Sequence, residues 1–151
     1  MVSTFDRFDK EILAILKENG RESYAEIGRK IGLSASAVRE RMQRLFDIGV
    51  IKNFTIEMDQ SQLGYKLEAF IIIKLFTNKL KAFISSVNRF EGVIKSYRIT
   101  GSHNVLMKVA LRDNQHLQEF LDKIMIFGDT TTFTVLSEIV DKENEAGSKI
   151  Q

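Results

Sequence analysis

The sequence of 151 residues contains no cysteine and only two histidines, at positions 103 and 116. The absence of cysteine excludes disulfide bonds, thiolate metal sites and cysteine nucleophiles. Two histidines thirteen residues apart cannot build a histidine-rich metal site alone. We therefore expect no metal site and no catalytic residue of these types.

The sequence also lacks a long apolar run. Its first residues, MVSTFDRFDKEIL, carry acids and resemble neither a signal peptide nor a membrane span. With 44% hydrophobic and 28% charged residues, the composition is typical of a globular domain. We expect a protein of the cytoplasm.

Net charge is small, at +2, but it is unevenly distributed. Residues 1–52 contain ten Lys or Arg against eight Asp or Glu, whereas residues 53–151 contain twelve of each. A basic excess confined to one part of the chain is typical of a nucleic-acid-binding unit, because phosphate neutralisation supplies most non-specific affinity.

The segment 23–51 has the pattern of two short helices joined by a tight turn. Asp6 and Asp9 have the spacing of the N-cap and N3 residues of a helix that precedes this segment. Ser23 and Glu26 have the spacing of a capping box at the start of the second helix. Gly32 interrupts that helix, and Ser34 is placed to cap a third. This order predicts a helix-turn-helix, whose second helix enters the DNA major groove.

The third helix separates apolar from polar residues. Val38, Met42 and Leu45 recur at a spacing that indicates a buried stripe, while small and basic residues occupy other faces. Isolated arginines are usually solvated, but several on one side of such a helix favour contacts to phosphate or guanine. The expected DNA-binding residues are Ser34, Ala35, Ser36, Arg39, Arg41 and Arg44.

The second half of the chain alternates between two periodicities. Strand patterns at 67–76, 93–100, 104–111 and 130–140 are separated by helical patterns at 80–87 and 117–124. The order βαββαβ predicts a ferredoxin-like domain, with two helices on one face of an antiparallel sheet. The expected fold class is α+β, a three-helix helix-turn-helix domain followed by this domain.

The strand at 67–76 is apolar on both sides. Because both helices cover the same face of the sheet, a second apolar face predicts a partner sheet from another copy of the chain. Phe70, Ile72 and Phe76 are the expected dimer-interface residues, although burial in a monomer core would also explain them.

These patterns divide the chain into four parts. We expect a DNA-binding domain at 1–52, a hinge strand and linker at 53–65, a ferredoxin-like domain at 66–140 and a frayed polar tail at 141–151.

Several motifs together resemble the Lrp/AsnC, or feast/famine, family of transcription regulators. The similar segments run from FDKEILAIL through GLSASAVRER and GVI to VIKSYRITGSHNVLMKV, and they span about Asp6 to Val140. The resemblance implies double-stranded DNA as a partner, dimers that often assemble into octamers as tetramers of dimers, and an amino-acid effector bound between dimers.

The resemblance also implies where that effector binds. The family's glycine loop corresponds to Gly101, His103 and Asn104, and its last-strand region corresponds to Thr130, Thr131, Thr132 and Thr134. Two acids common in the family loop are missing, and a loop without acids does not favour a lysine or arginine ligand. We therefore expect a neutral polar effector such as glutamine or asparagine. The threonines are equally explained as an ordinary β-strand.

Two other functions remain open at this point. Ferredoxin-like domains also occur in acylphosphatases, and Arg98 and Asn104 are residue types that such a hydrolase uses. However, the sequence has no glycine-rich phosphate loop before a helix. The second alternative is an RNA-binding or purely architectural protein without an effector. An RNA-reading sheet would require exposed strand aromatics, whereas the aromatics here lie in apolar surroundings.

Overall fold

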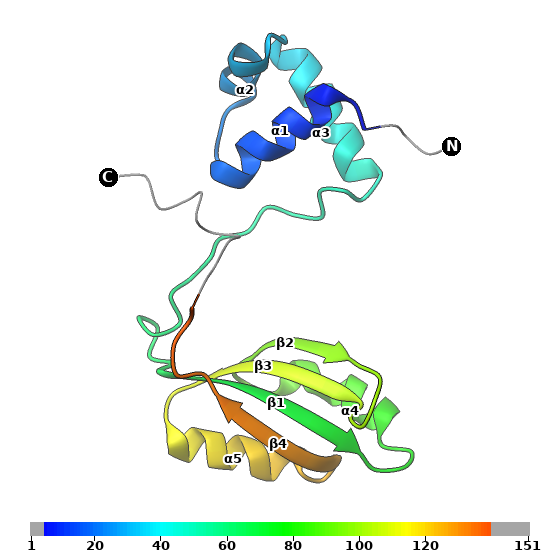
Figure 1. Cartoon of the computed structure of the whole chain (residues 1–151), viewed down its shortest axis with the longest axis vertical. Coiled ribbons are helices and arrows are strands. Elements are labelled where there is room, and N and C mark those ends of the chain that lie inside the picture. The colour runs from blue at the N-terminus through cyan, green and yellow to red at the C-terminus, as the bar shows by residue number, and fades with distance from the viewer. Residues whose placement is uncertain (1–4, 140–151) are drawn as a thin grey trace. The chain divides into compact units, whose positions relative to one another are not determined.

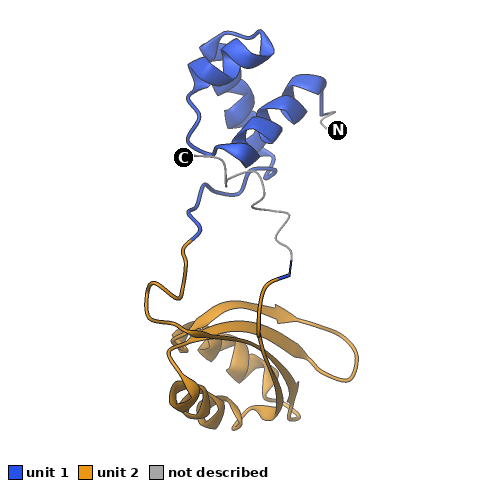
Figure 2. Ribbon diagram, turned by 60° about the vertical axis from the view of Figure 1, so that its left-hand side comes forward, with its two compact units in different colours: residues 1–57, 139–151 blue, residues 58–138 orange. Residues whose placement is uncertain are grey.

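The computed structural model describes residues 5–139, so the expected tail at 141–151 lies outside the described residues. The described residues divide into two compact units, the first made of residues 5–57 with Ile139 and the second of residues 58–138 (Figure 2). No helix within residues 5–139 is long and apolar enough to cross a membrane.

The first unit is made of three helices. Asp6 caps the first through a complete capping box with Asp9, and the Ser23 and Ser34 hydroxyls cap the next two. The capping box predicted at Ser23 and Glu26 is only half formed, because the Glu26 carboxylate pairs with Arg29. The helices are α1 (Arg7–Glu18), α2 (Tyr24–Ile31) and α3 (Ala35–Asp47) (Figure 1).

The three helices enclose one apolar core, and two glycines shape the turn between α2 and α3. A Cβ on Gly28 would lie 2.4 Å from the Leu33 carbonyl oxygen, so only glycine lets the chain approach so closely. Gly32 ends α2 with a φ of 74°, a left-handed conformation that favours glycine. The buried core residues are Ile12, Ile27, Val38, Met42 and Leu45.

Residues 53–59, within the expected hinge strand, form neither helix nor strand. The ring of Phe54 packs edge-on against Phe46, with 5.7 Å between the ring centroids. Ile56 and Met58 are exposed.

The second unit is a four-stranded antiparallel sheet with strand order β2-β3-β1-β4. The element order confirms the predicted βαββαβ domain, with a short 3₁₀ helix, η1, added before β2. The elements are β1 (Leu67–Leu75), α4 (Leu80–Ser86), η1 (Val87–Arg89), β2 (Val93–Arg98), β3 (Val105–Leu111), α5 (Asn114–Ile124) and β4 (Gly128–Thr134).

The two faces of the sheet differ. Helices α4 and α5 lie against one face (Figure 1), where Ala69, Ile71 and Ile73 of β1 are fully buried. The alternating residues point to the other face, which no described element of this unit covers, and Phe70 there remains 39% exposed. We call this second side the open face; its apolar residues include Phe70, Ile72, Leu106 and Phe133.

The last strand differs from the predicted one. β4 begins at Gly128 and ends at Thr134, whereas the β-branched pattern predicted residues 130–140. The strand can begin at Gly128 because glycine has no Cβ. A Cβ at this position would lie 2.3 Å from the Lys74 carbonyl oxygen, so no other residue could approach β1 as closely. Propensity alone cannot place this boundary, since pairing with β1 sets it.

Candidate DNA interface and effector site

The N-terminal end of α3 presents an exposed polar surface. Ala35, Ser36, Arg39 and Gln43 are all exposed, and their spacing places the last three on one side of the helix. Val38, Met42 and Leu45 are buried on the opposite side. We call this exposed side the outer face of α3.

Ser34 organises the start of α3. Its Oγ accepts a hydrogen bond from the Ala37 backbone N–H at 3.2 Å and lies 3.0 Å from Ser36 Oγ. The free backbone N–H groups of a helix N-terminus carry a partial positive charge and suit a phosphate. Ser34 and Ser36 therefore combine with the helix end to form a surface that can accept an anion.

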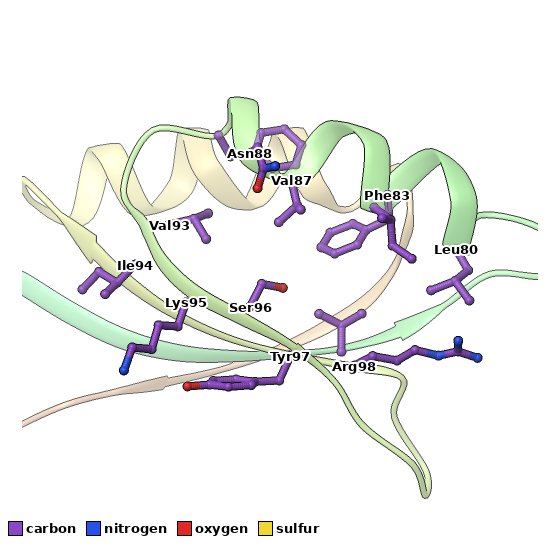
Figure 3. A pocket seen from close by; sticks show the side chains of 13 residues that line it. Leu80, Phe83, Val87, Asn88, Val93, Ile94, Lys95, Ser96, Tyr97 and Arg98 are labelled. Atoms are coloured by element: carbon purple, nitrogen blue, oxygen red, sulfur yellow. The ribbon is translucent and has the colours of Figure 1, made fainter. Parts of the chain in front are cut away.

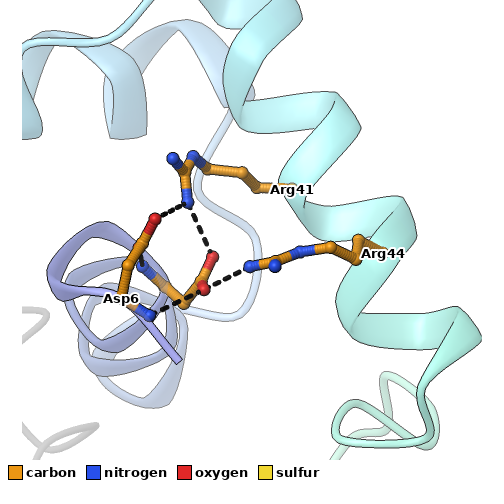
Figure 4. Close-up of polar contacts among 4 residues, drawn as sticks. Asp6, Arg41 and Arg44 are labelled. Atoms are coloured by element: carbon orange, nitrogen blue, oxygen red, sulfur yellow. Dashed lines mark hydrogen bonds and ion pairs between the residues drawn. The ribbon is translucent and has the colours of Figure 1, made fainter. Parts of the chain in front are cut away.

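Arg41 and Arg44 point to α1 (Figure 4). Nη1 of Arg41 lies 2.5 Å from Oδ2 of Asp6 and 3.0 Å from Oδ1 of Asp9, and Arg44 Nη2 donates to Oδ2 of Asp9. The Asp9 side chain is fully buried, whereas those of Arg41 and Arg44 are 26% and 40% exposed. These four residues form what we call the acid–arginine cluster. The prediction that Arg41 and Arg44 bind DNA is not tested by these contacts, which favour a structural role for both side chains.

The cluster favours ionised carboxylates. Burial of Asp9 opposes its ionisation, but hydrogen bonds from Arg44, the Asp6 backbone N–H and Arg41 outweigh it, so the pKa of Asp9 lies below its ordinary value. The Asp9 backbone N–H and the Arg41 guanidinium likewise lower the pKa of Asp6. The Asp6 carboxylate raises the pKa of Arg41 in turn.

The second unit has a hollow of about 420 Å³ beside the β2–β3 hairpin. Gly101 has a φ of 120° and open space around it, so a ligand can approach its backbone. Asn104 is held in place, since its backbone N–H donates to Ile73 O and its Oδ1 accepts from Leu75 N, both at 2.9 Å. The lining residues are Leu75, Phe76, Thr77, Leu80, Arg98, Ile99, Thr100, Gly101 and Asn104.

The other expected effector residues lie elsewhere. His103 Nδ1 shares a hydrogen bond of 2.9 Å with Ser102 Oγ, and His103 does not line the hollow. The threonines of β4 do not line it either, and β1 separates β4 from the strands of the hairpin. Thr130 and Thr132 pair with the buried Ile73 and Ile71, whereas Thr131 pairs with Ile72 on the open face. One chain therefore does not bring the loop and the threonines together.

A second hollow, of about 360 Å³, lies between α4 and β2. Ser96 points into it below Phe83 and Val87, while Lys95 and Tyr97 point to the other side of the sheet (Figure 3). Tyr97 is 50% exposed and pairs with Leu106, so it extends the open face to the β2 edge.

The residues expected at the dimer interface fall into two places. Phe70 and Ile72 lie on the open face, where Phe70 of β1 pairs with Phe133 of β4. Phe76 follows the end of β1 and lines the hollow beside Gly101. No group of three or more His, Asp or Glu in residues 5–139 could hold a metal ion.

Comparison with known proteins accounts for both units. The AsnC-type helix-turn-helix domain family matches residues 5–45, and the Lrp/AsnC ligand binding domain family matches residues 68–145. The chain belongs to the Lrp/AsnC family. It is thus a DNA-binding transcriptional regulator with a ligand-binding domain, which confirms the resemblance and sets aside the hydrolase alternative.

Individual Lrp/AsnC proteins match along nearly the whole chain. The HTH-type transcriptional regulator FL11 of Pyrococcus furiosus is 33% identical over 144 residues, which is 95% of each chain. The structure of Bacillus subtilis LrpC has a TM-score of 0.87 at 30% identity, covering 92% of this chain and 99% of LrpC. A Neisseria meningitidis transcriptional regulator in complex with L-Met has a TM-score of 0.85 at 25% identity, covering 91% of this chain and 94% of that one.

Sequence reasoning on this Lrp/AsnC chain missed several candidate residues. Gln43 was not among the expected DNA-binding residues because it is uncharged, but it is exposed on the outer face of α3 beside Arg39. Thr77 and Leu80 line the hollow beside Gly101, because the chain after β1 returns beside the hairpin. Asp9 was recognisable only as part of a cap, since its partners lie 32 and 35 positions away.

Proposed function

We propose that this Lrp/AsnC regulator reads duplex DNA with the outer face of α3 and responds to a small neutral polar amino acid. The observation that carries the proposal is the exposed N-terminal end of α3, where serines and an arginine meet a free helix terminus. Because the apolar stripe of α3 is buried against the other two helices, the exposed N-terminal end of α3 is available to contact DNA.

In this proposal the DNA-contacting residues are Ser34, Ala35, Ser36 and Arg39. The serines and the helix terminus bind phosphate, and small side chains let the backbone approach the groove. Arg39 binds phosphate or guanine, and the amide of Gln43 is suited to adenine. Arg41 and Arg44 are left out of this set, because their guanidinium groups lie against α1.

The proposed assembly is a homodimer formed through the open face, with the family's octamer as a larger form. Phe70, Ile72 and Phe133 offer an apolar surface that another copy would bury. A dimer presents two α3 helices to a pseudo-palindromic site with half-sites about 10 base pairs, or a multiple, apart.

For the effector, we propose glutamine or asparagine bound beside Gly101. The L-Met complex of the Neisseria meningitidis relative supports an amino acid as the ligand class. The hollow offers Thr77, Thr100 and Asn104 as neutral polar groups, and no carboxylate of the described residues lines it. Thr130, Thr131, Thr132 and Thr134 would have to come from another chain. If the effector binds one state of the protein more tightly than another, its binding would shift the equilibrium toward that state and so change assembly or DNA affinity.

DNA recognition is tested by selecting duplexes from a random library and then measuring binding as salt is varied. Arg39→Gln should weaken binding and reduce the slope of log affinity against log salt by about 0.9 for each phosphate that the side chain no longer neutralises. Lys10→Gln removes the same charge from α1 and is the matched control. Unchanged affinity and slope for Arg39→Gln would remove Arg39 from the interface.

Calorimetry with the twenty amino acids tests the effector. We expect glutamine or asparagine to bind most tightly, and Gly101→Val to abolish binding by blocking approach to the backbone. Tight binding of lysine, arginine or leucine alone would contradict the proposed ligand class.

A further inference from the structure

A buried carboxylate connects the first helix to the DNA-reading helix. Asp9 has a fully buried side chain, and each of its oxygens accepts a hydrogen bond from a different arginine of α3. The Asp9 oxygen Oδ2 also accepts from the Asp6 backbone N–H at 3.2 Å, so the same carboxylate completes the cap of α1. Asp9 is therefore fixed from both helices.

The two arginines are restrained but not enclosed. Their side chains are 26% and 40% exposed, and the cluster borders a surface hollow whose other lining residues, all on α3, are Ala37, Glu40, Gln43 and Asp47. An arginine side chain is long and flexible and binds phosphate well. Without Asp9, Arg44 loses this contact and Arg41 keeps only Asp6 as a carboxylate partner, so both guanidinium groups are less restrained from turning outward from the helix that we propose lies in the groove.

The charges of the cluster cancel. Asp6 and Asp9 supply two negative charges, and Arg41 and Arg44 supply two positive ones. Arg41 is held further by Phe8, whose ring centroid lies 5.3 Å from the Arg41 Cζ atom. The basic residues of α3 are thus divided into one outward arginine, Arg39, and two that are neutralised within the unit.

We propose that Asp9 is a specificity-determining residue, which positions α3 on α1 and withholds Arg41 and Arg44 from DNA phosphates. Phosphate contacts add affinity for every sequence alike, whereas discrimination comes from base contacts. By keeping two arginines on the protein, Asp9 limits the affinity for random DNA and preserves the ratio of specific to non-specific binding. The inference rests on the proposed DNA-reading role of α3.

The test is Asp9→Asn in the full chain, measured on random-sequence duplex DNA between 50 and 200 mM salt. Release of the arginines should steepen the slope of log affinity against log salt by about 0.9 for each additional phosphate bound, which is about 3.5-fold more loss of affinity over this range. Non-specific affinity at 50 mM should rise, and the specific to non-specific ratio should fall. A purely structural role for Asp9 would weaken binding without steepening the slope.

The matched control is Glu11→Gln. It makes the same charge change on α1, but in an exposed pair with Arg7 whose N–O distance is 2.7 Å. A general effect of net charge would steepen the slope in both variants, and that result would overturn the proposal. An unchanged slope in a folded Asp9→Asn protein would overturn it too.

A second variant decides the question if Asp9→Asn does not fold. Arg41→Gln/Arg44→Gln should leave the salt slope of the folded protein as in wild type, because the wild-type arginines do not contact phosphate. A slope lower by about 0.9 for each arginine would overturn the proposal. Failure of wild type to bind duplex DNA would instead contradict the proposed function.

Discussion

At the scale of single residues, the most consequential contact joins Asp9 to Arg41 and Arg44. A buried ion pair adds little stability compared with well-packed apolar residues, but loss of one partner is costly because the other charge is left behind. Here the arginines are partly exposed, so water can take over part of the interaction. We expect Asp9→Ala to reduce the free energy of unfolding by about 2 kcal/mol, as measured by urea unfolding.

Acid should weaken the first unit through the same residue. Because the folded-state pKa of Asp9 is lowered, its stabilising contribution is complete above the unfolded pKa of about 3.9 and is lost as pH falls through the lower folded value. Thermal unfolding followed by circular dichroism from pH 6 to pH 2 should therefore show a flatter profile for Asp9→Asn than for wild type. Identical profiles would mean that Asp9 does not supply this pH dependence.

Two glycines four positions apart should respond differently to alanine. Gly28→Ala places a Cβ 2.4 Å from the Leu33 carbonyl oxygen, and we expect a loss of about 3 kcal/mol because backbone must move. Gly32→Ala meets open space and costs only the strain of its left-handed backbone, about 1 kcal/mol. Urea unfolding measures both, and equal losses would contradict this reading of the turn.

Local residue roles could be predicted from sequence, and distant ones could not. The caps at Asp6, Ser23 and Ser34 were recognisable because each partner lies three positions along the chain. The pairing of Asp9 with Arg44 joins residues 35 positions apart, and the exposed arginine pattern alone favoured DNA contact. A single sequence does not show that the Asp9 carboxylate lies within hydrogen-bonding distance of these arginines.

At the scale of elements, α3 depends on its N-cap residue, Ser34, for both stability and presentation. The Ser34 hydroxyl satisfies a backbone N–H that would otherwise lack a partner within the helix. The element types and their order followed from periodicity, which predicted all four strands and both helices of the second unit. Strand ends did not follow from it, because pairing with neighbours sets where β4 stops.

The two serines at the start of α3 differ in role, because the Ser34 side chain caps the helix and the Ser36 side chain does not. Ser34→Ala should lower the free energy of unfolding by about 1 kcal/mol, the usual cost of losing an N-cap side chain. Ser36→Ala lies two positions on, where the hydroxyl caps nothing, and should change stability by no more than about 0.5 kcal/mol. Thermal melts of both variants test this, and a larger effect at Ser36 would show that Ser34 is not the cap that matters.

At the scale of the whole molecule, the open face is the apolar surface that no described element of the second unit covers. β1 is apolar on both sides, and its helix-covered side is buried while Phe70 opposite stays 39% exposed. The sequence predicted that two-sidedness, although it could not separate Phe76, which lines the hollow instead. Nor could it show that the loop and the β4 threonines lie apart within one chain.

Charge on the open face should prevent assembly. Phe70→Glu would bury an unpaired carboxylate in the proposed interface, so we expect light scattering at micromolar concentration to show monomer for this variant and dimer or larger for wild type. Ile84→Glu adds the same charge to an exposed position on α4 and should leave assembly unchanged. A monomeric wild-type protein would exclude the interface.

The acid–arginine cluster also limits how this regulator can be re-engineered. A chimera that replaces α3 with the recognition helix of another protein imports new residues at positions 41 and 44, while Asp6 and Asp9 remain on α1. If the imported helix lacks these arginines, a buried carboxylate loses its partners. The smallest exchangeable DNA-reading module of this chain is therefore the whole three-helix unit, with its first helix included.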